Sequence, residues 1–288
     1  MRYEITGHTT LIGLLGSPVG HSLSPKMHNE AFCTLGLDYC YLAFDVDETG
    51  LGAAVEGLKA MGARGMNLTM PCKNAVVSLC DRLSPAAQIC GAVNTVVIEK
   101  DRTMTGHTTD GVGFFWACRE EGFTIAGKKM TILGSGGAAT AIFVQAALDG
   151  AGEIALFTRS TSAFFPRTLQ VVETLRERTR CKIQIFDYED RRLKQEIHSS
   201  HLLVNGTSVG MAPKEEGCLI PDPSYLHPGL TVADIIYNPS ETRLVRMAKE
   251  AGCRAFGGSD MLLYQGAEAF SLWTGEQMPV EYIKTCFF

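Results

Sequence analysis

A glycine-rich turn between a predicted strand and a predicted helix constrains this chain more than any other feature. The turn, Gly134-Ser135-Gly136-Gly137-Ala138-Ala139, follows the strand-like residues 129–133 and opens the helical pattern of residues 138–148. Gly134 is expected to make the tight turn, Gly136 to let the backbone approach a pyrophosphate, and Ala139 to pack helix against strand. The start of the helix offers free N–H groups and a partial positive charge to phosphates. The turn therefore predicts a dinucleotide site, with a ligand-free strand–helix turn as the alternative.

The residues around this turn alternate between strand and helix patterns. Further strands are predicted at residues 153–157, 182–186, 202–204 and 231–236, and a further helix at 169–179. Strands joined by connections of helix length indicate a parallel sheet. We predict a Rossmann-type dinucleotide-binding domain at residues 111–258.

The N-terminal part of the chain shows the same alternation. Strands are predicted at residues 10–15, 39–46 and 64–68, helices at 25–35 and 50–61, and a hairpin at the edge of the sheet at 94–105. A helical pattern at 111–121 and a break at 122–127 place a domain boundary there. We predict an α/β fold with two domains. Residues 1–110 form a substrate-binding and catalytic domain with a mainly parallel sheet, completed by residues 259–288, whose apolar helix packs back on it.

Length and charge narrow the classes of function. The 288 residues exceed one average domain of roughly 100 to 200 residues. A net charge of −5 and a pI near 5.8 give no basic field for a nucleic-acid backbone. The N-terminus has no apolar leader, and no apolar run reaches the length of a membrane span. We expect a cytoplasmic monomer or homodimer with a small-molecule substrate and neither a nucleic-acid nor a membrane partner.

The ten cysteines are scattered and show neither Cys-x-x-Cys nor a metal-binding pairing with histidine. Free thiols and no metal site are expected. Cys72 has two interpretations: a reactive thiolate stabilised by Lys73, or a small packing residue, which is favoured.

The segment Asn67-Leu68-Thr69-Met70-Pro71-Cys72-Lys73 alternates polar and apolar side chains where a strand ends. Asn67 and Thr69 are expected on one face, and Pro71 to stop strand pairing before Lys73. A lysine at this position can polarise a carbonyl or take a proton from a hydroxyl. The alternative is an ordinary strand end followed by a surface lysine.

Other polar side chains also lie at predicted element ends. Ser22 and Ser24 precede a helix, where a carboxylate can bind, although Ser24 followed by Pro25 is also a good helix cap. Asn94 starts the predicted hairpin, and Asp110 lies in the turn that follows it. Asp110 is either a ligand-binding carboxylate or the cap of the next helix. Ligand crevices of parallel sheets form at such ends, so we group these residues into one candidate site.

These motifs together resemble those of the shikimate dehydrogenases, and more closely the quinate/shikimate dehydrogenase branch. The resemblance runs almost end to end. It rests on Ser22-Leu23-Ser24-Pro25, Asn67-x-Thr69-x-Pro71-x-Lys73, Gly91-Ala92-Val93-Asn94-Thr95, His107-Thr108-Thr109-Asp110-Gly111, Gly134-x-Gly136-Gly137 and the stretch from Gly258 to Gln265-Gly266-Ala267. Family members often carry Asn-Thr-Asp-Gly where this chain has the residues from His107 to Gly111.

The resemblance implies a Lys73 and Asp110 catalytic pair that handles the hydroxyl proton during hydride transfer. It implies that the substrate is held by Ser22, Ser24, Tyr41, Asn67, Thr69, Asn94, Tyr237 and Gln265. The implied substrates are shikimate and 3-dehydroshikimate, and also quinate and 3-dehydroquinate. The alternatives are a related amino-shikimate or methylene-tetrahydrofolate dehydrogenase, and a non-catalytic dinucleotide or metabolite sensor.

The expected cofactor is NADP or NAD. The strand at 153–157 is followed by Thr158, Arg159 and Ser160, with no carboxylate of the kind that favours NAD. Arg159 slightly favours NADP, unless it stacks on adenine under either cofactor. NADP-specific relatives carry Asn-Arg-Thr here, and the quinate/shikimate branch often carries Asn-Arg followed by an acidic residue. In this chain only the arginine of these motifs is present. The other residues expected to contact the cofactor are Gly134, Ser135, Gly136, Gly137, Ala138, Thr207, Ile235 and Gly258.

Overall fold

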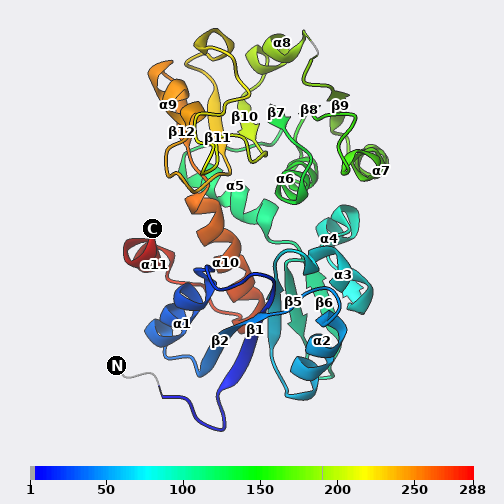
Figure 1. Cartoon of the computed structure of the whole chain (residues 1–288), viewed down its shortest axis with the longest axis vertical. Helices are drawn as coiled ribbons and strands as arrows, with labels where there is room; N and C mark the ends of the chain where they lie inside the picture. The colour runs from blue at the N-terminus through cyan, green and yellow to red at the C-terminus, as the bar shows by residue number, and fades with distance from the viewer. Residues whose placement is uncertain (1–3, 190) are drawn as a thin grey trace. The chain divides into compact units, whose positions relative to one another are not determined.

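The computed structural model describes residues 4–189 and 191–288. The chain divides into two compact units, one made of residues 1–109 and 263–288 and the other of residues 110–262. Each unit contains a six-stranded sheet with helices packed against it (Figure 1). This confirms the predicted α/β fold.

The first unit begins with the alternation that the sequence predicts. Its elements are β1 (Thr10–Gly16), α1 (Ser24–Leu35), β2 (Tyr39–Asp45), α2 (Leu51–Ala60), β3 (Gly65–Leu68), α3 (Cys72–Ala75), the 3₁₀ helix η1 (Val76–Leu79), β4 (Arg82–Leu83), α4 (Pro85–Cys90), β5 (Thr95–Ile98), β6 (Met104–His107) and α11 (Val280–Phe287). To these it adds the part of α10 (Ser259–Thr274) that follows Leu262.

The strand order in this unit is β2-β1-β3-β5-β6-β4. β1 pairs in parallel with β2 and β3, while β5 is antiparallel to β3 and β6. The predicted hairpin is therefore present, but its expected place at the edge of the sheet is wrong. The two-residue strand β4 pairs with β6 and covers that edge, and it is too short to give a period-2 signal in the sequence.

The opposite edge of this sheet is strand β2, and helix α1 bonds directly to its backbone. The Asn29 Nδ2 donates to the Tyr41 carbonyl at 2.9 Å, and the Tyr41 N–H donates to Asn29 Oδ1 at 2.8 Å. The side-chain amide thus takes the place of one residue of a neighbouring strand.

Helix α10 packs on the first unit through Trp273, which is almost fully buried. Its indole N–H donates to the Val96 carbonyl at 2.9 Å, and Arg64 Nε donates to the Trp273 carbonyl at 2.9 Å. These bonds confirm that the C-terminal apolar helix packs back on the first unit.

The second unit follows the predicted alternation closely. Its elements are α5 (Asp110–Glu120), β7 (Lys129–Leu133), α6 (Gly137–Leu148), β8 (Glu153–Phe157), α7 (Phe165–Arg178), β9 (Lys182–Phe186), α8 (Leu193–His198), β10 (Leu202–Asn205), η2 (Pro223–Tyr225), β11 (Thr231–Asp234), α9 (Arg243–Glu250) and β12 (Arg254–Phe256).

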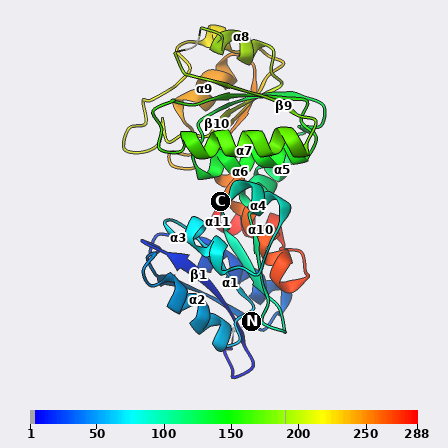
Figure 2. The ribbon, with the colours of Figure 1, turned by 90° about the vertical axis from the view of Figure 1, so that its right-hand side faces the viewer.

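All pairings between these strands are parallel, in the order β12-β11-β10-β7-β8-β9. This is the doubly wound order, in which the direction of winding reverses between β7 and β10, the first and fourth strands of this sheet in chain order. Helices α6 and α7 lie on one face of the sheet and α8 and α9 on the other (Figure 2). The carboxyl ends of β7 and β10 therefore form the switch point at which such sheets bind ligands.

Within the described ranges, no helix is both long and apolar enough to cross a membrane. The ten cysteines carry free thiols.

Candidate functional site

A chain of buried hydrogen bonds joins the polar motif residues of the first unit. The Tyr41 hydroxyl donates to Asn67 Oδ1 at 2.7 Å, and it also hydrogen-bonds Ser24. Asn67 Nδ2 donates to the Asn94 carbonyl at 2.9 Å and to Thr95 Oγ1 at 3.0 Å. Tyr41 is fully buried and Asn67 is 7% exposed. Strands β2, β3 and β5 thus hold their polar side chains by bonding them to one another.

The same network continues beyond Asn94. The Thr109 N–H donates to Asn94 Oδ1 at 2.9 Å, and Asn94 Nδ2 donates to Thr109 Oγ1 at 3.1 Å. Thr109 Oγ1 in turn lies 3.5 Å from Gln265 Oε1 on α10. Thr95 and Thr109 stand in two of the motifs but were not predicted as site residues, because a threonine inside a strand or before a helix does not by itself indicate a role in a site.

Ser22 and Ser24 form a tight turn at the start of α1. The Ser24 N–H donates to Ser22 Oγ at 3.2 Å, and both residues are half-buried. Ser24 is the first residue of the helix, so it lies where free backbone N–H groups favour an anion. Its bond to Tyr41 links this turn to the network.

Thr69 and Lys73 follow strand β3. The Thr69 N–H bonds to the Leu15 carbonyl of β1 at 2.9 Å, and the Lys73 carbonyl accepts from the Val93 N–H at 2.8 Å. Lys73 lies in the four-residue helix α3, which the sequence did not predict, and it is half-buried. The backbone bond to Val93 places this lysine beside the residue that precedes Asn94.

Cys72 has no exposed surface, and burial, with the charges of Glu48 and Asp47, raises the pKa of its thiol. Of the two interpretations, the packing role fits the structure and the stabilised thiolate does not.

Asp110 and Tyr237 belong to the second unit. Asp110 is the first residue of α5, directly after Thr109, and is 9% exposed. Tyr237 follows β11 and is 54% exposed.

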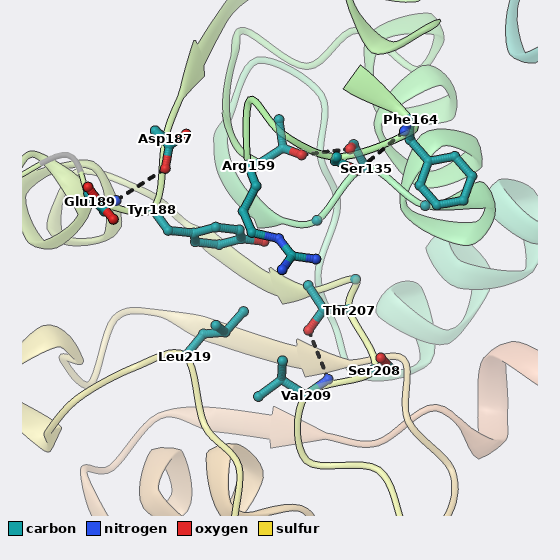
Figure 3. A pocket seen from close by; sticks show the side chains of 15 residues that line it. Ser135, Arg159, Phe164, Asp187, Tyr188, Glu189, Thr207, Ser208, Val209 and Leu219 are labelled. Carbon is teal, nitrogen blue, oxygen red and sulfur yellow. Dashed lines mark hydrogen bonds between the residues drawn. The ribbon is translucent and has the colours of Figure 1, made fainter. Parts of the chain in front are cut away.

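The second unit contains a cavity of about 540 Å³ at the carboxyl ends of its strands (Figure 3). Its lining comes from four strand ends: Gly134, Ser135 and Gly136 after β7, Thr158, Arg159, Ser162 and Phe164 after β8, Asp187, Tyr188 and Glu189 after β9, and Gly206, Thr207, Ser208 and Val209 after β10, with Leu219 from a loop. The structure therefore brings six of the predicted cofactor residues to one cavity: Gly134, Ser135, Gly136, Thr158, Arg159 and Thr207. The other predicted ones, Gly137, Ala138, Ser160, Ile235 and Gly258, are not among its lining residues.

The glycine-rich turn has the geometry that a bound dinucleotide requires. Gly134 has a φ of +104°, and a side chain there would meet the Gly206 carbonyl oxygen at 2.9 Å. Gly136 faces open space, and the first turn of α6 carries no acidic side chain. Gly137 and Ala138 begin the helix, and Ala139 is fully buried. The N-terminus of α6 thus fits a pyrophosphate.

Hydrogen bonds around the cavity fix its walls. Ser135 Oγ and Thr158 Oγ1 lie 2.7 Å apart, which ties the glycine-rich turn to the end of β8. Asn205 Oδ1 accepts from the Thr207 N–H at 3.1 Å and from its hydroxyl at 2.7 Å. Ile235 is half-buried after β11, and the Gly258 N–H donates to the Ile236 carbonyl at 2.9 Å.

The acidic residues of this cavity were not predicted. Asp187 and Glu189 follow β9, the third strand of this sheet in chain order. The sequence analysis looked for a carboxylate only after β8, the second strand. The strand at 182–186 was itself predicted, so its carboxyl end was the signal that could have located Asp187.

Two protein-family models match the chain. The model described as the shikimate dehydrogenase substrate binding domain matches residues 14–96, and the shikimate 5'-dehydrogenase C-terminal domain matches residues 258–285. A curated protein of Listeria innocua, named shikimate dehydrogenase (NADP(+)), is 51% identical over 99% of this chain and 98% of its own length.

Solved structures give the same result. Shikimate 5-dehydrogenase from Listeria monocytogenes, in complex with shikimate and NAD, has a TM-score of 0.97 and 50% identity, covering 100% of this chain and 99% of its own. Quinate dehydrogenase from Corynebacterium glutamicum, in complex with NAD, has a TM-score of 0.86 and 28% identity, covering 97% and 98%.

Proposed function

The chain belongs to the shikimate dehydrogenase family of oxidoreductases, and we propose on that premise that it interconverts 3-dehydroshikimate and shikimate with NADP or NAD. The observation that supports this best is the buried network from Ser24 through Tyr41, Asn67 and Asn94 to Gln265. It gathers amide and hydroxyl groups, which suit a polyhydroxylated ring, on the unit that also carries Lys73.

The Ser22 and Ser24 turn is the proposed site for the substrate carboxylate. It offers hydroxyl groups at the N-terminus of α1, where an anion is favoured. The exposed ring of Tyr237 is a further proposed carboxylate contact. Thr69, Asn67, Asn94 and Gln265 then face the ring hydroxyls, with Tyr41 buried behind Asn67.

Lys73 and Asp110 are the proposed catalytic pair. When a ring alcohol is oxidised, its hydroxyl must lose a proton as hydride leaves the carbon, so a base within hydrogen-bond reach is required. Lys73 takes this proton or stabilises the developing alkoxide, and Asp110 orients the same hydroxyl. In the reverse direction the pair returns the proton to the carbonyl oxygen.

The cofactor accepts or supplies the hydride when it is bound. The open space at Gly136, the bare N-terminus of α6 and the cavity beside Arg159 fit a nicotinamide dinucleotide. Gly134 to Ala138 would hold the pyrophosphate, Thr158, Arg159 and Ser160 the adenosine ribose, and Thr207, Ile235 and Gly258 the nicotinamide side. Arg159 supplies the positive charge that a 2′-phosphate needs.

Quinate is a second proposed substrate, since it presents the same carboxylate and ring hydroxyls, and a relative at 28% identity is named quinate dehydrogenase. The decisive experiment is a set of initial rates of the purified chain, with shikimate and quinate each tested against NADP and NAD. We expect shikimate to be oxidised. Absence of turnover with every cyclohexene and cyclohexane carboxylate tested, together with tight nucleotide binding, would favour the non-catalytic sensor. Turnover of an amino-shikimate alone would favour that related dehydrogenase.

A further inference from the structure

Among the described residues that line the cofactor cavity, one side chain is positive and two are negative, and the negative ones follow strand β9. Arg159 follows β8, whereas Asp187 and Glu189 follow β9. We propose that Asp187 is a specificity-determining residue of this site, which opposes the 2′-phosphate of NADP and thereby admits NAD. The inference rests on the proposed function for the position of the cofactor.

Asp187 already occupies hydrogen-bond donors that a 2′-phosphate would use. The Ser160 N–H donates to Asp187 Oδ2 at 3.1 Å, and the Ser160 hydroxyl also bonds this carboxylate. Ser160 directly follows Arg159, in the loop where a Rossmann-type site distinguishes the two cofactors. A phosphate at this loop has to displace the carboxylate or lie beside it.

The carboxylate of Asp187 is ionised at neutral pH. The hydrogen bond from the Ser160 N–H is the main cause that lowers the pKa of this carboxyl. Bonds from the Glu189 N–H and the Ser160 hydroxyl act in the same direction. A 2′-phosphate therefore meets a fixed negative charge. The ribose 2′-hydroxyl of NAD instead meets an acceptor, as it does in sites that carry an acidic residue at the end of the second strand.

Arg159 acts in the opposite direction. It is exposed, and its guanidinium lies beside the ring of Tyr188, the residue after Asp187 (Figure 3). The choice between NADP and NAD thus depends on two opposed charges on neighbouring strands. Arg159 alone predicts NADP, whereas Arg159 with Asp187 predicts that both cofactors bind with similar affinity.

Calorimetric binding of 2′,5′-ADP and ADP tests the inference on the intact chain without turnover. Asp187→Asn removes the charge but keeps an oxygen that can accept from Ser160. We expect the affinity ratio of 2′,5′-ADP over ADP to rise about tenfold, because one like charge near the phosphate is lost. The ratio of kcat/KM for NADP over NAD should rise by the same factor.

Asp149→Asn is the matched control. Asp149 is an exposed carboxylate at the end of α6 that bonds Gln145, outside the cofactor cavity. This variant should keep the wild-type ratio, which separates the effect of Asp187 from a general change in charge.

An unchanged or lower ratio in Asp187→Asn would overturn the inference, and so would failure of the wild type to bind either nucleotide. If Asp187→Asn does not fold, Asp187→Ser, which also lacks the charge, has to show the same rise. Nucleotide binding with the expected ratio but no oxidation of shikimate would contradict the proposed function alone.

Discussion

The two polar sites of this molecule are built in opposite ways. In the first unit, Tyr41, Asn67 and Asn94 are buried and bonded to one another. In the cavity of the second unit, buried Ser135 and Thr158 are also bonded to each other, but the side chains of Arg159 and Ser208 are exposed. The first site is held in shape by its own hydrogen bonds, and such preorganisation lowers the entropy cost of binding one particular ligand. The second relies on a balance of charges, which a single residue can shift.

Replacing Lys73 tests whether the hydrogen-bonded site of the first unit is catalytic, and it has the largest expected effect on the rate. Lys73→Ala should lower kcat by about 10² to 10⁴, because the group that handles the hydroxyl proton is lost. Steady-state rates with shikimate measure this. Lys100→Ala, at an exposed lysine in the hairpin turn of the same unit, is the control and should keep wild-type turnover. Wild-type turnover in Lys73→Ala as well would remove Lys73 from the catalytic pair.

The contrast between an ordered and an open site predicts different costs for losing one hydroxyl. Tyr41→Phe leaves the buried Asn67 Oδ1 without its donor, which should cost about 1 to 3 kcal/mol of unfolding free energy. Ser208→Ala, at the exposed rim of the cavity, should change stability by less than about 0.5 kcal/mol. Urea denaturation of both variants measures the difference. Equal losses would show that the two sites do not differ in this way.

A smaller effect than the loss of the Tyr41 hydroxyl is expected for pH and His28, whose ring packs against Tyr41 of the network. Its ring stacks on Tyr41 with centroids 4.6 Å apart, neither ring nitrogen has a hydrogen-bond partner, and burial lowers its pKa to about 3. The unfolded chain takes up a proton near pH 6.5 and the folded chain does not, so stability falls as pH drops below that value.

Between pH 7 and 5.5 this loss should be about 1 kcal/mol, and His28→Phe should abolish it. Denaturation midpoints at both pH values measure the change. His8→Phe, at an exposed histidine, should keep the wild-type pH dependence. A pH dependence that survives in His28→Phe would mean that other groups cause it.

Local patterns were enough to predict much of the fold. Strands β7, β8 and β9 begin and end at the predicted residues. Mostly apolar runs mark β7 and β8, and alternating polar and apolar residues mark β9, which lies at the edge of its sheet. Helix α9 was missed although it carries a visible signal. The Thr242 hydroxyl caps it by accepting from the Val245 N–H, and apolar residues recur through Leu244 and Met247.

The candidate site was predictable where a motif names its residues and not where the fold supplies them. Asn67 and Asn94 stand in motifs, and the structure bonds them together. Thr109 also stands in a motif, but its bond to Asn94 spans 15 residues of sequence. Asp187 stands in no motif and bonds Ser160 across 27 residues. No local pattern encodes such pairings, because they depend on which strand ends lie side by side.

The side-chain amide of Asn29 limits how another chain can pair with the edge strand β2. An outermost strand exposes unpaired N–H and C=O groups, and these invite a strand of another chain to add to the sheet. On β2, both backbone groups of Tyr41 are already taken by Asn29. An incoming strand finds no backbone partner at Tyr41, so one side chain of helix α1 blocks strand addition at this position of β2.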